Sequence, residues 1–200
     1  IEGSTRKWQA HREKMRVALQ RHDSIMRSAI TGNQGHVFKT VGDAFCAVFP
    51  TALDALSATI EAQLALQNEE WDDDVPIRVR MAIHTGEAEE RDDDYYGPTL
   101  NRVARLLSIG HGGQTLLSLV TAELVRDQLP ERVRLRDMGN RRLKDLTRPE
   151  AVYQVVHPDL PEEFAELASL DSHPNNLPQQ PSPLIGREEQ LAAIHRLFFE

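Results

Sequence analysis

Lys39 and Asp43 stand at the two ends of a short turn that contains glycine and lies between two apolar runs. Residues 36–40 and 44–49 have the composition of strands, so the turn between them predicts a tight hairpin. A hairpin holds polar side chains rigidly at a sheet edge, which suits a binding or catalytic site. Turns also contain glycine and aspartate for conformational reasons alone. This segment by itself does not decide between the two readings.

A second polar group lies near the start of a predicted helix, residues 99–109, for which Thr99 is the expected cap. Asn101 and Arg105 are four residues apart and therefore share one face of that helix. An amide and a guanidinium side by side near a helix start can clamp a phosphate. The alternative is that polar side chains here lie on a solvent-exposed helix face, and we interpret Arg102 in this way.

These residues need a scaffold, and the pattern of apolar residues predicts one. The period of the apolar positions indicates helices after residue 4, after Pro50, from residue 99 and from residue 121. Besides the hairpin, strands are expected at residues 77–85, 115–119, 133–138, 141–146 and 152–156. This order of elements predicts an α+β or α/β sandwich with helices packed on a mixed sheet.

Composition narrows the class of protein. The 200 residues carry a formal net charge of -8 with no block rich in lysine and arginine, which argues against binding nucleic acid. Cys46 is the one cysteine, so the chain cannot form an internal disulfide and suits the reducing cytoplasm. No apolar run approaches the roughly 20 residues of a membrane span. We therefore expect a cytoplasmic domain with no membrane segment in this stretch.

The domain organisation follows from a change in composition near His157. Residues 1–157 have the mixed pattern of one packed domain, and residues 158–183 are rich in proline and predict a linker. Residues 184–200 have a new helical pattern and resemble the opening of a signalling NTPase domain, although no GxxxxGK[ST] loop is present. A C-terminal NTPase in the same chain is therefore expected.

Four segments in order, residues 1–5, 39–43, 94–105 and 142–146, together resemble the class III adenylate and guanylate cyclase catalytic domain. The resemblance covers residues 1–157. It implies an α+β (ferredoxin-like) sandwich with a mixed, mainly antiparallel sheet. It also implies an enzyme in which two divalent cations, Mg²⁺ or Mn²⁺, help the 3′-hydroxyl of ATP to attack the α-phosphate, giving cyclic AMP and pyrophosphate.

The resemblance assigns metal and phosphate contacts position by position. Asp43 matches the second of the two metal aspartates, and Ile1 matches a residue whose backbone carbonyl reaches a metal. Gly3, Ser4 and Thr5 match the loop whose N–H groups meet the triphosphate. The first metal aspartate would directly precede Ile1, so we expect this chain by itself to have little or no activity.

The resemblance also assigns the residues that read the base. Lys39 matches the lysine that contacts the adenine ring, and Asp94 its partner, which accepts from the exocyclic amine. Guanylate cyclases typically carry glutamate and cysteine here, so ATP is the expected substrate rather than GTP. Asp94 is chosen from residues 92–94 by its spacing to Asn101, and the other two aspartates stay open. Asn101 and Arg105 match residues that orient the ribose and stabilise the transition state.

In this family the site lies between two subunits, so the resemblance implies a homodimer with shared sites. One subunit would supply the metal aspartates, and the other the base-reading pair together with Asn101 and Arg105. The alternative is a non-catalytic module that dimerises or senses nucleotides and regulates the neighbouring NTPase. The presence of all these residues favours catalysis.

Overall fold

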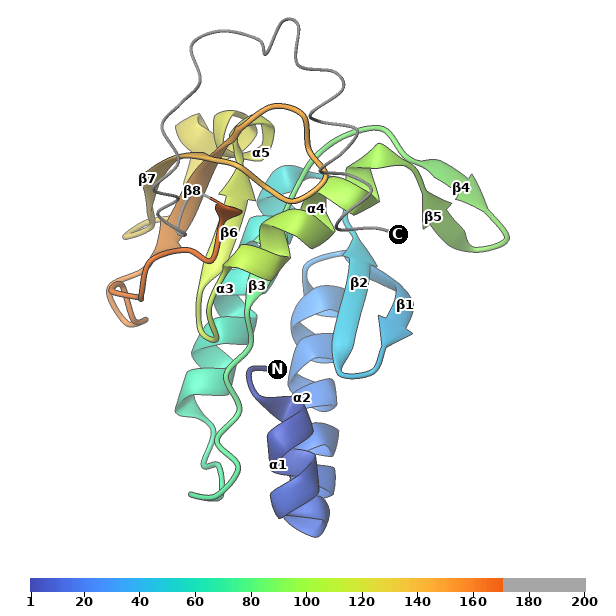
Figure 1. Cartoon of the computed structure of the whole chain (residues 1–200), viewed down its shortest axis with the longest axis vertical. Coiled ribbons are helices and arrows are strands. Elements are labelled where there is room, and N and C mark those ends of the chain that lie inside the picture. Colours follow the sequence, from blue (N-terminus) through green and yellow to red (C-terminus); the bar gives the residue numbers. More distant parts are fainter. Residues whose placement is uncertain (171–200) are drawn as a thin grey trace, which may run out of the picture.

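The structure is a computed structural model that describes residues 1–170 (Figure 1). The predicted linker beyond residue 170 and the predicted NTPase start at 184–200 lie outside the described residues. The helices are α1 (Ser4–Ala10), α2 (Arg12–Gly32), α3 (Ala52–Asn68), α4 (Pro98–Ile109), α5 (Leu119–Val125) and the 3-10 helix η1 (Arg126–Gln128). The strands are β1 (His36–Val41), β2 (Ala44–Val48), β3 (Met81–Ile83), β4 (Glu89–Arg91), β5 (Asp94–Tyr96), β6 (Thr115–Ser118), β7 (Arg134–Arg141) and β8 (Glu150–Val156).

A four-stranded sheet in the order β3-β6-β8-β7 forms the centre of the fold. β3 runs parallel to β6, whereas β8 is antiparallel to both β6 and β7. β1 and β2 pair only with each other, as do β4 and β5, in antiparallel hairpins. The predicted α+β class with a mixed, mainly antiparallel sheet is therefore confirmed.

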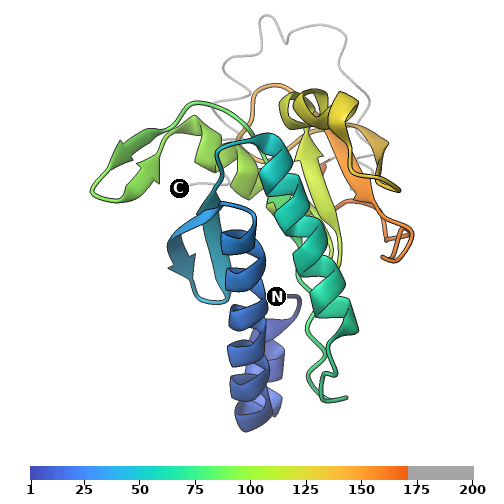
Figure 2. The same ribbon diagram turned by 180° about the vertical axis from the view of Figure 1, so that it is seen from behind.

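Helices cover both faces of this sheet, because successive strand residues point to opposite sides. Ile83 and Leu117 pack with α3 and α5, whereas Leu116 packs with Leu106 and Ile109 of α4. Figure 2 shows α2 running beside α3, and their buried faces meet residues that lead into β3. The sheet thus fixes α4, which carries Asn101 and Arg105, on the face opposite α3.

Three local predictions from the sequence differ from the structure. The first helix is broken at His11, whose extended φ of -140° separates α1 from α2. The predicted strand over 77–85 is paired only at β3. No strand forms over 141–146, because β7 ends at Arg141 and the chain then turns at Asp145, which has a left-handed φ of 62°. A strand cannot continue through that conformation.

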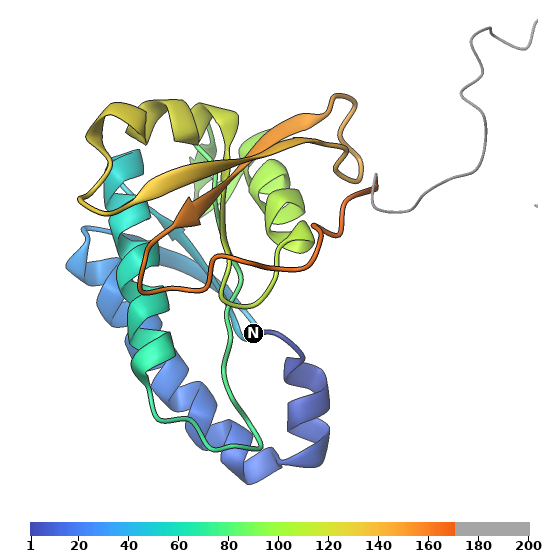
Figure 3. The same cartoon turned by 90° about the vertical axis from the view of Figure 1, so that its left-hand side faces the viewer.

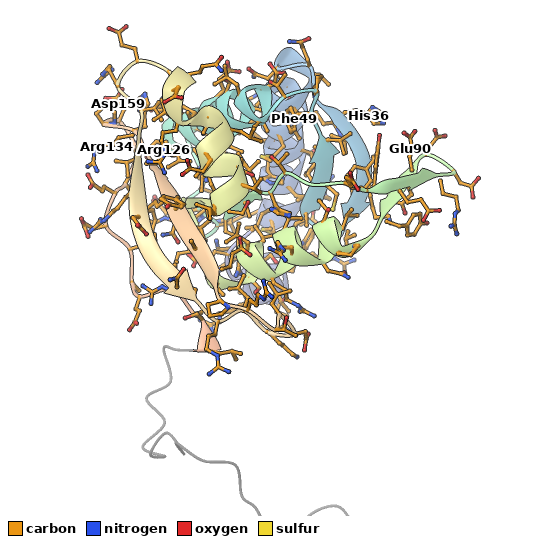
Figure 4. All side chains as sticks on the ribbon, turned by 90° about the horizontal axis from the view of Figure 1, so that it is seen from above. His36, Phe49, Glu90, Arg126, Arg134 and Asp159 are labelled. Atoms are coloured by element: carbon orange, nitrogen blue, oxygen red, sulfur yellow. The ribbon has the colours of Figure 1, made fainter. Side chains whose placement is uncertain are left out.

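The β4–β5 hairpin was not predicted, because its residues are acidic and do not alternate between apolar and polar. Every residue of β4 is exposed, and Asp92 and Asp93 form the turn with positive φ angles of 52° and 58°. Figures 1 and 4 show this hairpin projecting from the body of the protein, with Glu90 on it. Paired strands form here without a buried face of their own.

Residues 158–170, the first part of the predicted linker, pack against the domain, and we call them the C-terminal arm. Figure 3 shows the arm running from the end of β8 toward α4. Four of its acidic residues form ion pairs with arginines on or beside β7: Asp159 with Arg132, Glu162 and Glu163 with Arg134 and Arg136, and Glu166 with Arg141. Proline-rich composition alone did not predict this packing.

The end of the arm is tied to the core by Leu167, which is 1% exposed and packs with Leu106 and Leu143. We expect Leu167→Ala to lower the free energy of unfolding by about 3 kcal/mol, because it leaves a cavity in a closed cluster. Leu170→Ala is the matched control, since Leu170 is 57% exposed and its loss should change stability by less than about 0.5 kcal/mol. Equal denaturation midpoints for the two variants would contradict this role.

The part of the chain that the structure describes holds no helix both long and apolar enough to span a membrane.

Candidate active site

The β1–β2 hairpin positions Lys39 and Asp43 as the sequence predicts. Lys39 lies opposite Cys46 in the strand register, and Val41 lies opposite Ala44 at the end of the pairing. Gly42 has φ 60°, a left-handed conformation that glycine adopts without steric cost. The turn therefore presents Asp43 at one end of the hairpin while Lys39 projects from β1.

Lys39 meets Asp94 of β5, 55 residues further along the chain, in a hydrogen-bonded ion pair. Edge-to-face packing of Phe38 on Tyr95, with ring centroids 5.0 Å apart, holds the two hairpins together. The hydrogen bond raises the pKa of Lys39 and lowers the pKa of Asp94 below their ordinary values. A cation and an acceptor are thus side by side and both charged at neutral pH.

The structure also separates the three consecutive aspartates. Asp92 and Asp93 lie in the exposed turn between β4 and β5, whereas Asp94 begins β5 and is half-buried. Among the residues described, Asp94 is the carboxylate that pairs with Lys39. The structure therefore places Asp94 beside Lys39, and its role in reading the base stays a prediction.

In the folded structure, Asp43 lies beside Ile1. Its Oδ2 is 2.9 Å from the backbone nitrogen of Ile1, and its side chain is 23% exposed. Asp43 and Ile1, two of the candidate metal contacts, are therefore neighbours in the structure.

Gly3, Ser4 and Thr5 line a hollow together with Ile1, Glu2, Arg6 and Arg80. Gly3 caps α1 with a left-handed φ of 65°, and the helix begins at Ser4. Backbone N–H groups at a helix start and a nearby guanidinium both favour an anionic group. Sequence reasoning missed Arg80, although it occupies a polar position between the apolar Val79 and Met81.

The family's divalent cations can be tested against these residues. A carboxylate oxygen is the ligand type that Mg²⁺ and Mn²⁺ prefer, and the partly buried Asp43 side chain offers such an oxygen beside Ile1. Residues 1–170 nevertheless contain no cluster of three or more histidine, cysteine, aspartate or glutamate side chains that could hold a metal. The chemistry of Asp43 fits a cation, while the set of ligands among residues 1–170 is incomplete.

α4 presents the other two candidate residues. The cap is Gly97 rather than the expected Thr99, because Pro98 occupies the first turn and the Thr99 hydroxyl donates to the Glu87 carbonyl instead. Asn101 is exposed on this helix. Arg105 donates from Nη2 to Asp145 Oδ2 at 2.6 Å, a partner that sequence reasoning did not predict.

The candidate residues thus form two groups within this chain. Lys39 and Asp94 are in direct contact, and Asp43 contacts Ile1. Across residues 1–170, no hydrogen bond or ion pair joins Asp43 to Asn101 or Arg105. One chain therefore does not assemble the predicted metal and phosphate contacts around a single point.

Comparison with known proteins identifies the family. The model of the adenylate and guanylate cyclase catalytic domain matches residues 1–156, so the chain belongs to this family. An uncharacterized protein of Mycobacterium tuberculosis is 40% identical over 96% of this chain, and the chain spans 66% of that relative's length. Adenylate cyclase of Neurospora crassa is 31% identical over 78% of this chain, which covers 9% of that protein.

Solved structures agree with this assignment. A structure of Trypanosoma brucei adenylate cyclases in their monomeric state superposes with a TM-score of 0.74 at 27% identity, covering 84% of this chain and 91% of that one. An adenylate/guanylate cyclase/hydrolase from Silicibacter pomeroyi gives a TM-score of 0.58 at 31% identity, over 66% and 76% of the two chains. The fold is thus that of the class III cyclases.

Proposed function

We propose that this domain belongs to an adenylate cyclase that converts ATP to 3′,5′-cyclic AMP and pyrophosphate. The observation that carries the proposal is the ion pair between Lys39 and Asp94. A carboxylate at this place accepts a hydrogen bond from the exocyclic amine of adenine and repels the carbonyl that guanine presents there. The adenylate cyclases among the relatives support the same choice.

The candidate residues have different roles in the proposed phosphoryl transfer. When bound, two divalent cations supply positive charge at the attacking and leaving oxygens, and Asp43 with the Ile1 carbonyl would hold them. The loop of Gly3, Ser4 and Thr5 binds and orients the triphosphate through its N–H groups. Asn101 orients the ribose, and Arg105 neutralises charge that develops on the α-phosphate.

The site is proposed to lie between two copies of the chain. Asp43 and Arg105 make no contact within one chain, and Arg105 carries an exposed guanidinium that a second subunit can approach. In a symmetric dimer, each copy then supplies Asp43 to one site and Arg105 to the other. A C-terminal NTPase acting in the same chain remains part of this proposal.

The test is cyclic nucleotide production with Mn²⁺ and either ATP or GTP. It uses the chain extended upstream by the strand expected to carry the first aspartate, called the extended chain below. Cyclic AMP from ATP, with little cyclic GMP from GTP, supports the proposal. A dimer in solution that forms no product from either nucleotide would instead favour a non-catalytic dimerisation or nucleotide-sensing module.

The 200-residue chain itself is expected to make little or no cyclic AMP. Asp43 offers one carboxylate, but the described residues hold no cluster of three or more metal-binding side chains around it. Loss of metal clamping removes most of the catalysis in a two-metal site. Product formed from ATP and Mn²⁺ by the 200-residue chain, at a rate comparable to the extended chain, would refute this expectation.

A further inference from the structure

Asp145 contacts Arg105 from a loop that the proposed reaction does not otherwise use. Its Oδ2 accepts from Arg105 Nη2 at 2.6 Å, and the two side chains are 60% and 39% exposed. An exposed ion pair contributes only about 0–1 kcal/mol to stability. The effect of this contact on where the guanidinium lies is therefore more important than its effect on folding.

The loop that carries Asp145 is fixed to α4. Leu143 is 1% exposed and packs in one cluster with Leu106, the residue that follows Arg105. Leu146 packs against the same cluster, and its N–H donates to the Leu143 carbonyl at 3.2 Å to close the turn. Asp145 lies between these two anchors, so its position relative to Arg105 is set by the core.

The backbone of Asp145 adds a second observation. Its φ of 62° lies in the left-handed region, which glycine, asparagine and aspartate adopt more readily than other residues. The turn therefore accepts an aspartate at position 145, where its carboxylate reaches Arg105.

The two arginines on one side of α4 have separate partners. Arg102 donates from Nη1 to Glu150 Oε2 at 2.8 Å, at the start of β8. Within residues 1–170, Asp145 is the carboxylate at ion-pair distance from Arg105. The contact uses Nη2 of Arg105 and leaves the donors on Nε and Nη1 for another acceptor.

We propose that Asp145 is a positioning residue that holds one nitrogen of Arg105, so that the remaining donors face the α-phosphate. This inference rests on the proposed function, because it concerns the same reaction. The pair presents the guanidinium in one orientation before substrate arrives, and less ordering of Arg105 is needed in the transition state. The contribution should therefore appear in kcat rather than in KM.

Asp145→Asn and Asp145→Gly test the proposal in the extended chain, because both residues tolerate the left-handed backbone. We expect kcat to fall about fivefold or more while KM for ATP stays within about twofold. The melting temperature should be unchanged or higher. In an Arg105→Lys background, Asp145→Asn should have no further effect on kcat.

Glu123→Gln is the matched control, since it breaks the exposed pair of 2.5 Å between Glu123 of α5 and Arg126 of η1, away from Arg105. It should leave kcat unchanged. An unaltered kcat in both Asp145 variants would overturn the proposal. A higher kcat with a lower KM would overturn it as well, because Asp145 would then compete with the substrate for Arg105.

A measurement that does not need activity separates this proposal from the proposed function. In the 200-residue chain, the guanidinium NMR signals of Arg105 should show restricted rotation, which Asp145→Asn removes. Free rotation in the wild-type chain would overturn the positioning role whatever the enzyme assay shows. An inactive extended chain with restricted rotation would instead count against the proposed function alone.

Discussion

Asp43→Ala in the extended chain should abolish cyclic AMP production, lowering kcat by about a thousandfold or more, equivalent to roughly 4 kcal/mol of transition-state stabilisation. The reason is that the Asp43 carboxylate lies in the hairpin turn beside Ile1, where the proposed cations bind. Arg105→Ala should lower kcat by about a hundredfold or more, since it removes charge stabilisation at the phosphate. The measurement is the initial rate of cyclic AMP formation.

Mixing the two inactive variants tests the shared site directly. A heterodimer has one site with neither Asp43 nor Arg105 and one site with both. Random exchange makes about half of the dimers heterodimers with one of two sites intact, so about a quarter of wild-type activity should return. Asp43→Ala mixed with an Asp43→Ala, Arg105→Ala double variant is the control and should stay inactive.

No recovery in a mixture shown to contain heterodimers would contradict the shared site. Asp43 and Arg105 of the same chain would then have to act in one site, which the structure does not favour. Asp43 and Arg105 lie on separate elements, the β1–β2 turn and α4, and Arg105 is instead held by Asp145. The mixing experiment is therefore more informative than either variant alone.

The parts of the fold that sequence predicted are those with clear periodicity. α3 and α4 have apolar residues at helical spacing, and β1 and β2 are bounded by a glycine turn. The β4–β5 hairpin could not be predicted, because exposed acidic strands such as Glu89–Arg91 bury no apolar face. Its strands form because Asp94 and Tyr95 contact Lys39 and Phe38 of another hairpin.

The candidate site likewise contains residues that the sequence predicted and one that it did not. Asn101 and Arg105 could be named from their types and spacing, whereas Lys39 and Asp94 were paired through the resemblance to the cyclase family, and the structure places these two in contact. Asp145 could not be found in this way, because its contact with Arg105 spans 40 residues and depends on a left-handed turn. Long-range contacts of this kind leave no local pattern in a sequence.

The second large effect concerns the choice of base. Lys39→Glu combined with Asp94→Cys should shift the ratio of kcat/KM for ATP over GTP by about a hundredfold toward GTP. Asp94 accepts from an adenine amine, whereas a glutamate at position 39 would accept from the amino and ring N–H groups of guanine. The assay measures cyclic AMP and cyclic GMP with both nucleotides in competition.

Each single variant should lose activity with ATP without gaining activity with GTP. Lys39→Glu leaves Asp94 facing a second carboxylate, and Asp94→Cys leaves Lys39 without its partner, because the two side chains form one ion pair. Lys14→Glu is the matched control, since Lys14 forms a comparable exposed pair with Asp72 and Asp74 elsewhere. It should leave the ATP-to-GTP ratio unchanged.

The pair also predicts how base selection depends on pH. The hydrogen bond raises the pKa of Lys39 and lowers the pKa of Asp94, so both groups stay charged between about pH 5 and pH 9. The preference for ATP over GTP should therefore remain constant across that range, even where kcat itself changes. A preference that titrates near neutrality would mean that a group other than Lys39 and Asp94 reads the base.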